Sequence, residues 1–191
     1  MKRIFIGIGA AVLAVLIAGL ALLPGVLEGQ INRIVDGVPI DITEEARARH
    51  GELAVVDLHA DTLLWARDPL DRADRGHVDL PRLVDGNVTL QVFSVVTKVP
   101  RDQRYTGTSG DSDVITLLAM VQRWPARTWD SLFERALYQA EKLHRAEDAA
   151  SGDLTIVRSA ADIDRLIAAR GDGNRPVGGL LATEGSHPLE G

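Results

Sequence analysis

AVVDLHAD, residues 54–61, combines a short apolar run with two potential metal ligands. The apolar residues predict a strand that is buried on both faces, as in a parallel sheet. His59 and Asp61 follow where that strand ends, and side chains two apart on an extended backbone project to the same side. Zinc accepts imidazole nitrogen and carboxylate oxygen, so the pair predicts a metal site. The alternative is a histidine that only forms hydrogen bonds and an Asp61 that caps the next segment.

The composition is that of a globular protein, and it excludes several classes of function. The 191 residues are 46% hydrophobic and 25% charged, with a formal net charge of −6. This acidic balance, without any basic run interleaved with aromatic residues, argues against nucleic acid as a partner. The chain has no cysteine. A metal ion must therefore be held by histidine, aspartate and glutamate.

The N-terminus carries an apolar segment long enough to cross a membrane. Residues 4–23 contain no charged or strongly polar side chain, and a helix of roughly 20 residues spans a hydrocarbon core of about 30 Å. Because Lys2 and Arg3 should stay cytoplasmic, we predict a single-pass anchor over residues 1–25, with the rest of the chain on the extracytoplasmic, periplasmic side. The alternative is a signal peptide cleaved near residues 19–21, which would give a secreted protein.

Helices and strands are expected to alternate after the anchor. Pro24-Gly25 is expected to end the apolar helix, and residues 26–52 to form a tether with a short helix that begins at Thr43. Alternation of strands with helices predicts an α/β fold with a parallel sheet. The expected strands are residues 54–58, 89–97, 154–157 and 177–183, and the main expected helices are residues 80–85, 113–124, 129–143 and 159–170.

A second carboxylate follows the strand expected at residues 177–183. Glu184 stands at the end of its strand as His59 and Asp61 stand at the end of theirs. Groups at successive strand ends are how the sites of parallel barrels are built. His77 could also be a ligand, although a lone loop histidine is more often a hydrogen-bonding or surface residue.

Three motifs occur in order along the chain: VDLHADTL at residues 56–63, VDLPRL at residues 78–83 leading into QVFSV, and EGSH at residues 184–187. Together they resemble the membrane (renal) dipeptidase family of zinc metallopeptidases, M19, from about Leu53 to the last residue. The resemblance implies a TIM-like (β/α)8 barrel that holds two zinc ions. It also implies hydrolysis of dipeptides by metal-activated water, with the second ion polarising the scissile carbonyl.

The resemblance also assigns roles to the candidate site residues. His59 and Asp61 would bind one zinc ion, and Glu184 would bridge both ions as a metal ligand and catalytic residue. His187 matches the family pattern but receives no ligand role. The partners of the complete enzyme would be a dipeptide and the membrane, and a homodimer stays open.

The chain is shorter than the resemblance requires. A (β/α)8 barrel takes roughly 250 residues, whereas residues 53–191 would supply about three strands and neither of the family's later zinc histidines. We therefore expect an N-terminal fragment: the first part of a TIM-like barrel, preceded by a transmembrane helix. The 191-residue chain alone is expected to be inactive.

Two other functions stay open. One is another binuclear hydrolase of the amidohydrolase type, which the H-x-D of residues 59–61 disfavours because that class typically has H-x-H. The other is an inactive membrane-anchored remnant, whose motifs persist without a complete site. A reading frame that continues past Gly191 with two further histidines at strand ends would favour an enzyme.

Overall fold

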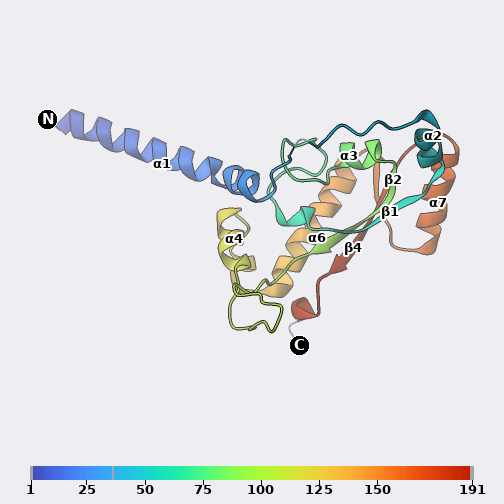
Figure 1. Cartoon of the computed structure of the whole chain (residues 1–191). Helices are drawn as coiled ribbons and strands as arrows, with labels where there is room; N and C mark the ends of the chain where they lie inside the picture. The colour runs from blue at the N-terminus through green and yellow to red at the C-terminus, as the bar shows by residue number, and fades with distance from the viewer. Residues whose placement is uncertain (1, 36, 190–191) are drawn as a thin grey trace.

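The structure, a computed structural model, describes residues 2–35 and 37–189. A long helix, α1 (Lys2–Ile31), projects from an α/β domain (Figure 1). The elements that follow are α2 (Glu44–Glu52), β1 (Val55–Ala60), the 3-10 turn η1 (Thr62–Leu64), α3 (Leu80–Asp85), β2 (Val88–Val95), α4 (Ile115–Val121), α5 (Arg127–Asp130), α6 (Leu132–Ala149), β3 (Leu154–Ile156), α7 (Ala160–Gly171), β4 (Val177–Thr183) and η2 (His187–Leu189).

The four strands form one parallel sheet in the order β1-β2-β4-β3. The predicted α/β fold with a parallel sheet is thus confirmed. β2 and β4 pair along six residues, from Leu90 opposite Gly178 to Val95 opposite Thr183. The short β3 pairs only with the first three residues of β4, on the side away from β2. The carboxyl ends of β1, β2 and β4 therefore lie together at one edge of the sheet.

Neighbouring groups pack closely on β4 because two glycines follow its first residue, Val177. A Cβ atom at Gly178 would lie 2.5 Å from Leu166 Cδ1 of α7, and one at Gly179 would lie 3.3 Å from Phe93 Cε2. Phe93 belongs to a buried cluster that includes Leu143 of α6. The absent side chains thus allow α7 and the Phe93 ring to approach the strand.

The expected helix over residues 129–143 is two helices, α5 and α6, with a break at Ser131. Ser131 has an extended backbone, with φ −110° and ψ 122°, and its hydroxyl accepts a hydrogen bond from Glu134 N at 3.0 Å. A serine in this position is a favourable N-cap, so the chain begins a new helix there.

Arg135 of α6 ties the end of β2 to three helices. Its side chain is 1% exposed, and all five of its N–H groups have acceptors at 2.5–2.7 Å. The acceptors are the backbone oxygens of Thr97, Thr128 and Trp129 and the side chains of Asp113 and Thr116. The network therefore satisfies every donor of a buried guanidinium group.

The expectation that β1 is buried on both faces is wrong. Val56 is 46% exposed and Leu58 is 72% exposed. β1 lies at the edge of the sheet and pairs only with β2 among the described strands. An apolar sequence pattern indicates that a strand can be buried, but it does not show what covers the strand. No described element covers the face of β1 that carries Val56 and Leu58.

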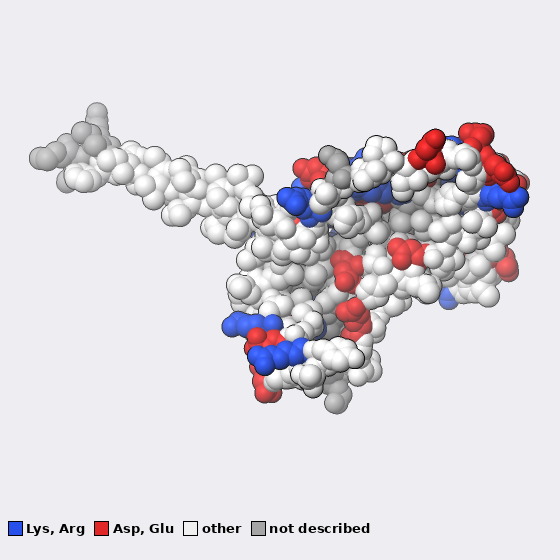
Figure 2. All heavy atoms as spheres, viewed as in Figure 1, with Lys and Arg blue, Asp and Glu red and all other residues white. Residues whose placement is uncertain are grey.

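The expectation that Pro24-Gly25 ends the apolar helix is also wrong, because α1 continues through Pro24 to Ile31. Over Phe5–Ile31 the helix is long and apolar enough to cross a membrane, by length and composition. In Figure 2 the arm that it forms is white along most of its length, in contrast to the charged surface of the domain. Pro24 and Glu28 are buried, so contacts with the domain stabilise the last turns of α1.

Candidate metal centre

The carboxyl ends of β1 and β4 bring the three predicted donor side chains together. His59 Nε2 lies 2.9 Å from Glu184 Oε1 and 3.2 Å from Asp61 Oδ1. One potential ligand atom from each residue lies within 4.8 Å of the others. Because β2 separates β1 from β4 and neighbouring strands are about 4.8 Å apart, the side chains of His59 and Glu184 reach across the end of β2.

The end of β1 is a bulge followed by a turn. Asp57 lies opposite Gln91 and Ala60 opposite Phe93, so β1 contains one residue more than β2 over this interval. Within the bulge, Asp57 Oδ1 accepts a hydrogen bond from His59 N at 3.1 Å. Bulges commonly re-aim a side chain beside a functional site. The convergence of His59 on its neighbours therefore depends on Asp57, to which the sequence analysis assigned no role.

Asp61 does not continue the extended backbone on which its predicted alignment with His59 was based. Its φ of −88° and ψ of 29° place it at the N-cap position of η1, but its side chain makes no capping hydrogen bond there. The Asp61 carboxylate therefore does not cap η1, which was the alternative to a role as metal ligand. It lies beside the imidazole because the chain turns after Ala60.

The three side chains suit a divalent cation. Donors bonded to one tetrahedral zinc ion at roughly 2.1 Å lie about 3.4 Å apart, close to the two distances measured from His59 Nε2. Asp61 Oδ1 is buried and forms no hydrogen bond with any described residue, although His59 Nε2 lies 3.2 Å away. A buried carboxylate oxygen without a donor is costly, and a cation would remove that cost. The three side chains are 42–53% exposed, which leaves room for water and substrate.

A cavity of about 230 Å³ lies beside His59 and Asp61, and its lining includes His77, Trp65 and Asn32. His77 thus lies near the donors but is not one of the three that converge. His187 packs against Gly185, which has a φ of +76°, and a Cβ atom there would lie 3.3 Å from His187 Nδ1. Glycine adopts this left-handed conformation most readily, so it suits the turn that follows Glu184.

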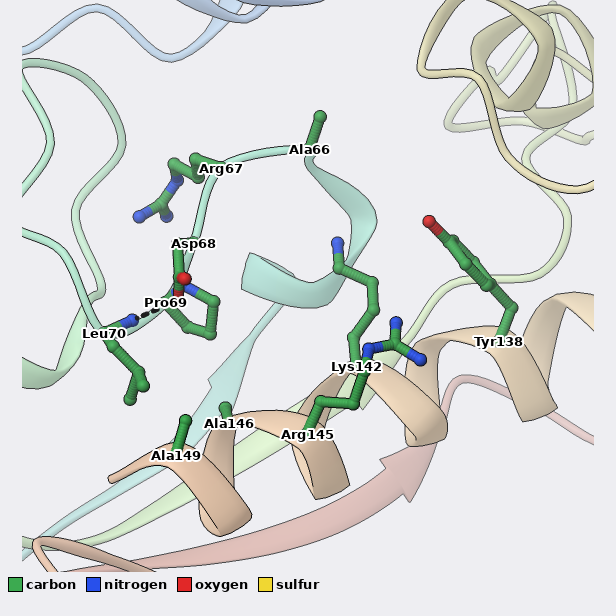
Figure 3. Close-up of a pocket in the computed structure, with 10 residues that line it drawn as sticks. All are labelled: Ala66, Arg67, Asp68, Pro69, Leu70, Tyr138, Lys142, Arg145, Ala146 and Ala149. Carbon is green, nitrogen blue, oxygen red and sulfur yellow. Dashed lines mark hydrogen bonds between the residues drawn. The ribbon is translucent and has the colours of Figure 1, made fainter. Parts of the chain in front are cut away.

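The turn after Asp61 is held from the other side by Lys142 of α6. Lys142 Nζ donates hydrogen bonds to Leu63 O at 2.7 Å and to Trp65 O, which satisfies carbonyl groups at the end of η1. Figure 3 shows this side chain pointing from α6 toward η1, at a cavity of about 350 Å³. Burial lowers the pKa of Lys142 to about 8.

The burial of Lys142 predicts that the stability of the fold depends on pH. Between the folded-state pKa of about 8 and the ordinary value of 10.5, the unfolded chain binds more protons than the folded chain. Relative to Lys142→Met, the free energy of unfolding of the wild type should rise by up to about 3 kcal/mol as the pH increases through this window. This gain in the free energy of unfolding is complete above pH 10.5, and it is lost as the pH falls through 8. Urea denaturation at several pH values measures the difference, with Lys98→Met as control, and a difference independent of pH would contradict the prediction.

Comparison with known proteins places the chain among the metallopeptidases. It belongs to the membrane dipeptidase family, peptidase family M19, whose family model matches residues 43–191. This match confirms the family resemblance of the sequence motifs. The search of curated proteins gave no match.

Two solved structures are similar to the chain. One is dipeptidase AC, a metallopeptidase of family M19, at 24% identity and a TM-score of 0.44. The other is a metallopeptidase from Rhodobacter sphaeroides, solved with a phosphinate mimic of the dipeptide L-Ala-D-Ala, at 25% identity and a TM-score of 0.46. Each comparison covers 71% of this chain, and 36% and 39% of the two solved chains respectively. This chain therefore spans well under half the length of either.

Proposed function

We propose that the chain carries the His59, Asp61 and Glu184 part of a zinc-dependent dipeptidase centre. The observation that supports this most is the convergence of these three donors at the carboxyl ends of β1 and β4, on either side of β2, in a chain of family M19. Bound zinc would supply a Lewis acid and would lower the pKa of water to near neutrality. The substrate would be a dipeptide.

The residues at the ends of β1 and β4 would have different roles in binding the metal ions. His59 and Asp61 would hold one ion from β1, while Asp57 keeps the bulge that aims the imidazole. Glu184 would approach from β4 and bridge two ions, and its Oε1 faces His59. The half-exposed donors and the cavity beside them would admit a small substrate. A second ion needs more donors than the three that converge here.

We also propose that residues 53–191 are the N-terminal part of a TIM-like barrel, in which β1, β2 and β4 are neighbouring strands. They are parallel and adjacent, and β3, which comes between β2 and β4 in the sequence, pairs on the outer side of β4. Exposed Val56, Leu58 and Leu180 offer an apolar surface that a barrel interior would bury. Residues 1–25 would anchor this part on the extracytoplasmic side of a membrane, and residues 26–52 would connect it to the anchor.

The test begins with metal binding by the full chain in detergent. After dialysis against zinc-containing buffer, the wild type should retain about one zinc ion per chain, and His59→Ala should retain almost none, because His59 supplies the only nitrogen among the three donors. His144→Ala is the matched control, since His144 is an exposed histidine on α6. Equal retention by the wild type and His59→Ala would refute the proposed site.

Hydrolysis tests the rest of the proposal. We expect this chain alone to hydrolyse dipeptides no faster than His59→Ala, because three donors cannot hold two ions, and faster turnover would contradict that. An enzyme that also has the donors for the second ion should hydrolyse dipeptides, including ones with a C-terminal D-residue. It should not hydrolyse cyclic amides. The reverse preference would favour the amidohydrolase alternative.

A further inference from the structure

Glu28, near the end of α1, is a buried carboxylate with two cationic partners. Its side chain is 1% exposed. Glu28 Oε1 accepts a hydrogen bond from Arg67 Nε at 2.8 Å, and Oε2 accepts one from Arg75 Nε at 3.1 Å. An unpaired buried carboxylate is strongly unfavourable, so these two arginines account for an acidic residue that follows the apolar part of α1.

The last turns of α1 lie in contact with the side chain of Arg75. Gly25 and Gly29 lie one helical turn apart, and Cβ atoms there would lie 3.4 Å from Arg75 Nη2 and 3.7 Å from Arg75 Cδ. Backbone contacts continue beyond the helix, where Gly76 N donates to Asn32 O at 2.8 Å. The end of α1 is therefore fastened to the loop around residue 75 by both side chains and backbone.

Arg67 extends this contact to the candidate metal centre. Its side chain is 5% exposed, and Nη2 donates to the hydroxyl of Thr62, the residue after Asp61, at 3.4 Å. Its Nη1 has no hydrogen bond with the described residues, and Asp79 Oδ2 is 4.0 Å away from it. Glu28 is thus the main anionic partner that keeps the Arg67 guanidinium against the turn that carries Asp61.

We infer that Glu28 is a positioning residue for the metal centre, which makes the end of α1 part of the site as well as a connection to the membrane helix. The inference rests on the proposed function. Glu28 fixes Arg67, Arg67 contacts Thr62, and Thr62 fixes the direction in which the Asp61 carboxylate leaves the backbone. Cleavage near residues 19–21 would leave Glu28 in place, so an anchored and a secreted chain would both keep this contact.

The experiment measures the zinc dissociation constant of the full chain in detergent by competition with a chelator. Glu28→Gln keeps the shape of the side chain and removes its charge, so it should bind zinc at least about tenfold more weakly, as is typical when a residue supporting a metal ligand is changed. Glu28→Asp keeps the charge on a shorter side chain, so its zinc dissociation constant should lie between those of the wild type and Glu28→Gln.

Asp113→Asn is the matched control, because it removes a carboxylate from another buried ion pair, with Arg135. It should lower the melting temperature but leave the zinc dissociation constant within about twofold, since the hydrogen bonds of Asp113 go to Val99, Ile115, Thr116 and Arg135 and not to the turn at residues 61–64. If Glu28→Gln does not fold, Arg67→Lys takes its place, because a lysine cannot contact Glu28 and Thr62 together.

The outcomes separate the two claims. Suppose the wild type binds zinc and folded Glu28→Gln binds it with the same dissociation constant. The role of Glu28 would then be overturned, and the proposed function would stand. Equal loss of affinity in Glu28→Gln and Asp113→Asn would show a general effect of destabilisation and would also overturn it. A wild type that binds no zinc would refute both.

Discussion

Glu184→Gln should lower the occupancy of both metal ions in the complete centre and abolish hydrolysis. Glu184 is the donor that comes from β4, and its Oε1 lies 2.9 Å from His59 Nε2. Glutamine keeps the shape of the side chain but loses the anionic charge that would bind the ions and reduce their mutual repulsion. Elemental analysis after dialysis, together with a dipeptide assay, measures both effects.

Asp61→Asn is the comparison for this variant. Asp61 lies beside His59 on the β1 side, so its loss should chiefly weaken the ion shared with His59 and leave the other ion partly bound. A Glu184→Gln enzyme with two zinc ions per chain and near-normal turnover would show that Glu184 does not bridge. The assignment of Glu184 would then be wrong.

Arg135→Met should destabilise the fold by about 3–5 kcal/mol, the typical cost of removing one partner of a buried ion pair. Burial alone would raise the pKa of Asp113, yet hydrogen bonds from Arg135, Ile115 and Val99 hold that pKa below its ordinary value. Without Arg135, this carboxylate loses its cation, and the backbone oxygens of Thr97, Thr128 and Trp129 lose a donor.

Chemical denaturation of the two proteins measures this change in the free energy of unfolding. Arg145→Met is the control, since Arg145 lies on the same helix and is 60% exposed in a loose ion pair with Glu141. It should change stability by no more than about 0.5 kcal/mol. A loss below about 1 kcal/mol in Arg135→Met would contradict the importance of the network.

The candidate donors could be predicted because they follow strands that the apolar pattern reveals. Parallel strands end at one edge of a sheet, so His59, Asp61 and Glu184 could be expected to meet once the sequence pattern predicted a parallel sheet. The bulge that aims His59 could not be predicted, because it depends on how β1 pairs with β2. Asp57, two residues before His59, was the only local signal of it, since aspartate commonly accepts a hydrogen bond from a backbone two residues on.

Contacts between distant parts of the chain were beyond the reach of sequence patterns. Glu28 and Arg67 are separated by 39 positions, and neither has a feature that identifies its partner. The position of β3 outside β4 was also hidden, because a run of three residues can indicate a strand but not its neighbour. The expected end of α1 at Pro24-Gly25 failed for the same reason, since packing on the domain outweighs the tendency of proline and glycine to interrupt a helix.

The unbroken course of α1 has a consequence for where an anchored enzyme would work. Glu28 lies five residues after Leu23, which at 1.5 Å per residue is a rise of about 7.5 Å. If residues 4–23 cross a bilayer, the docked helix would hold the domain at a fixed height just above the lipid headgroups and would restrict its rotation. The protein would then search in two dimensions and meet substrates in the thin water layer beside the membrane, before they diffuse into the surrounding fluid.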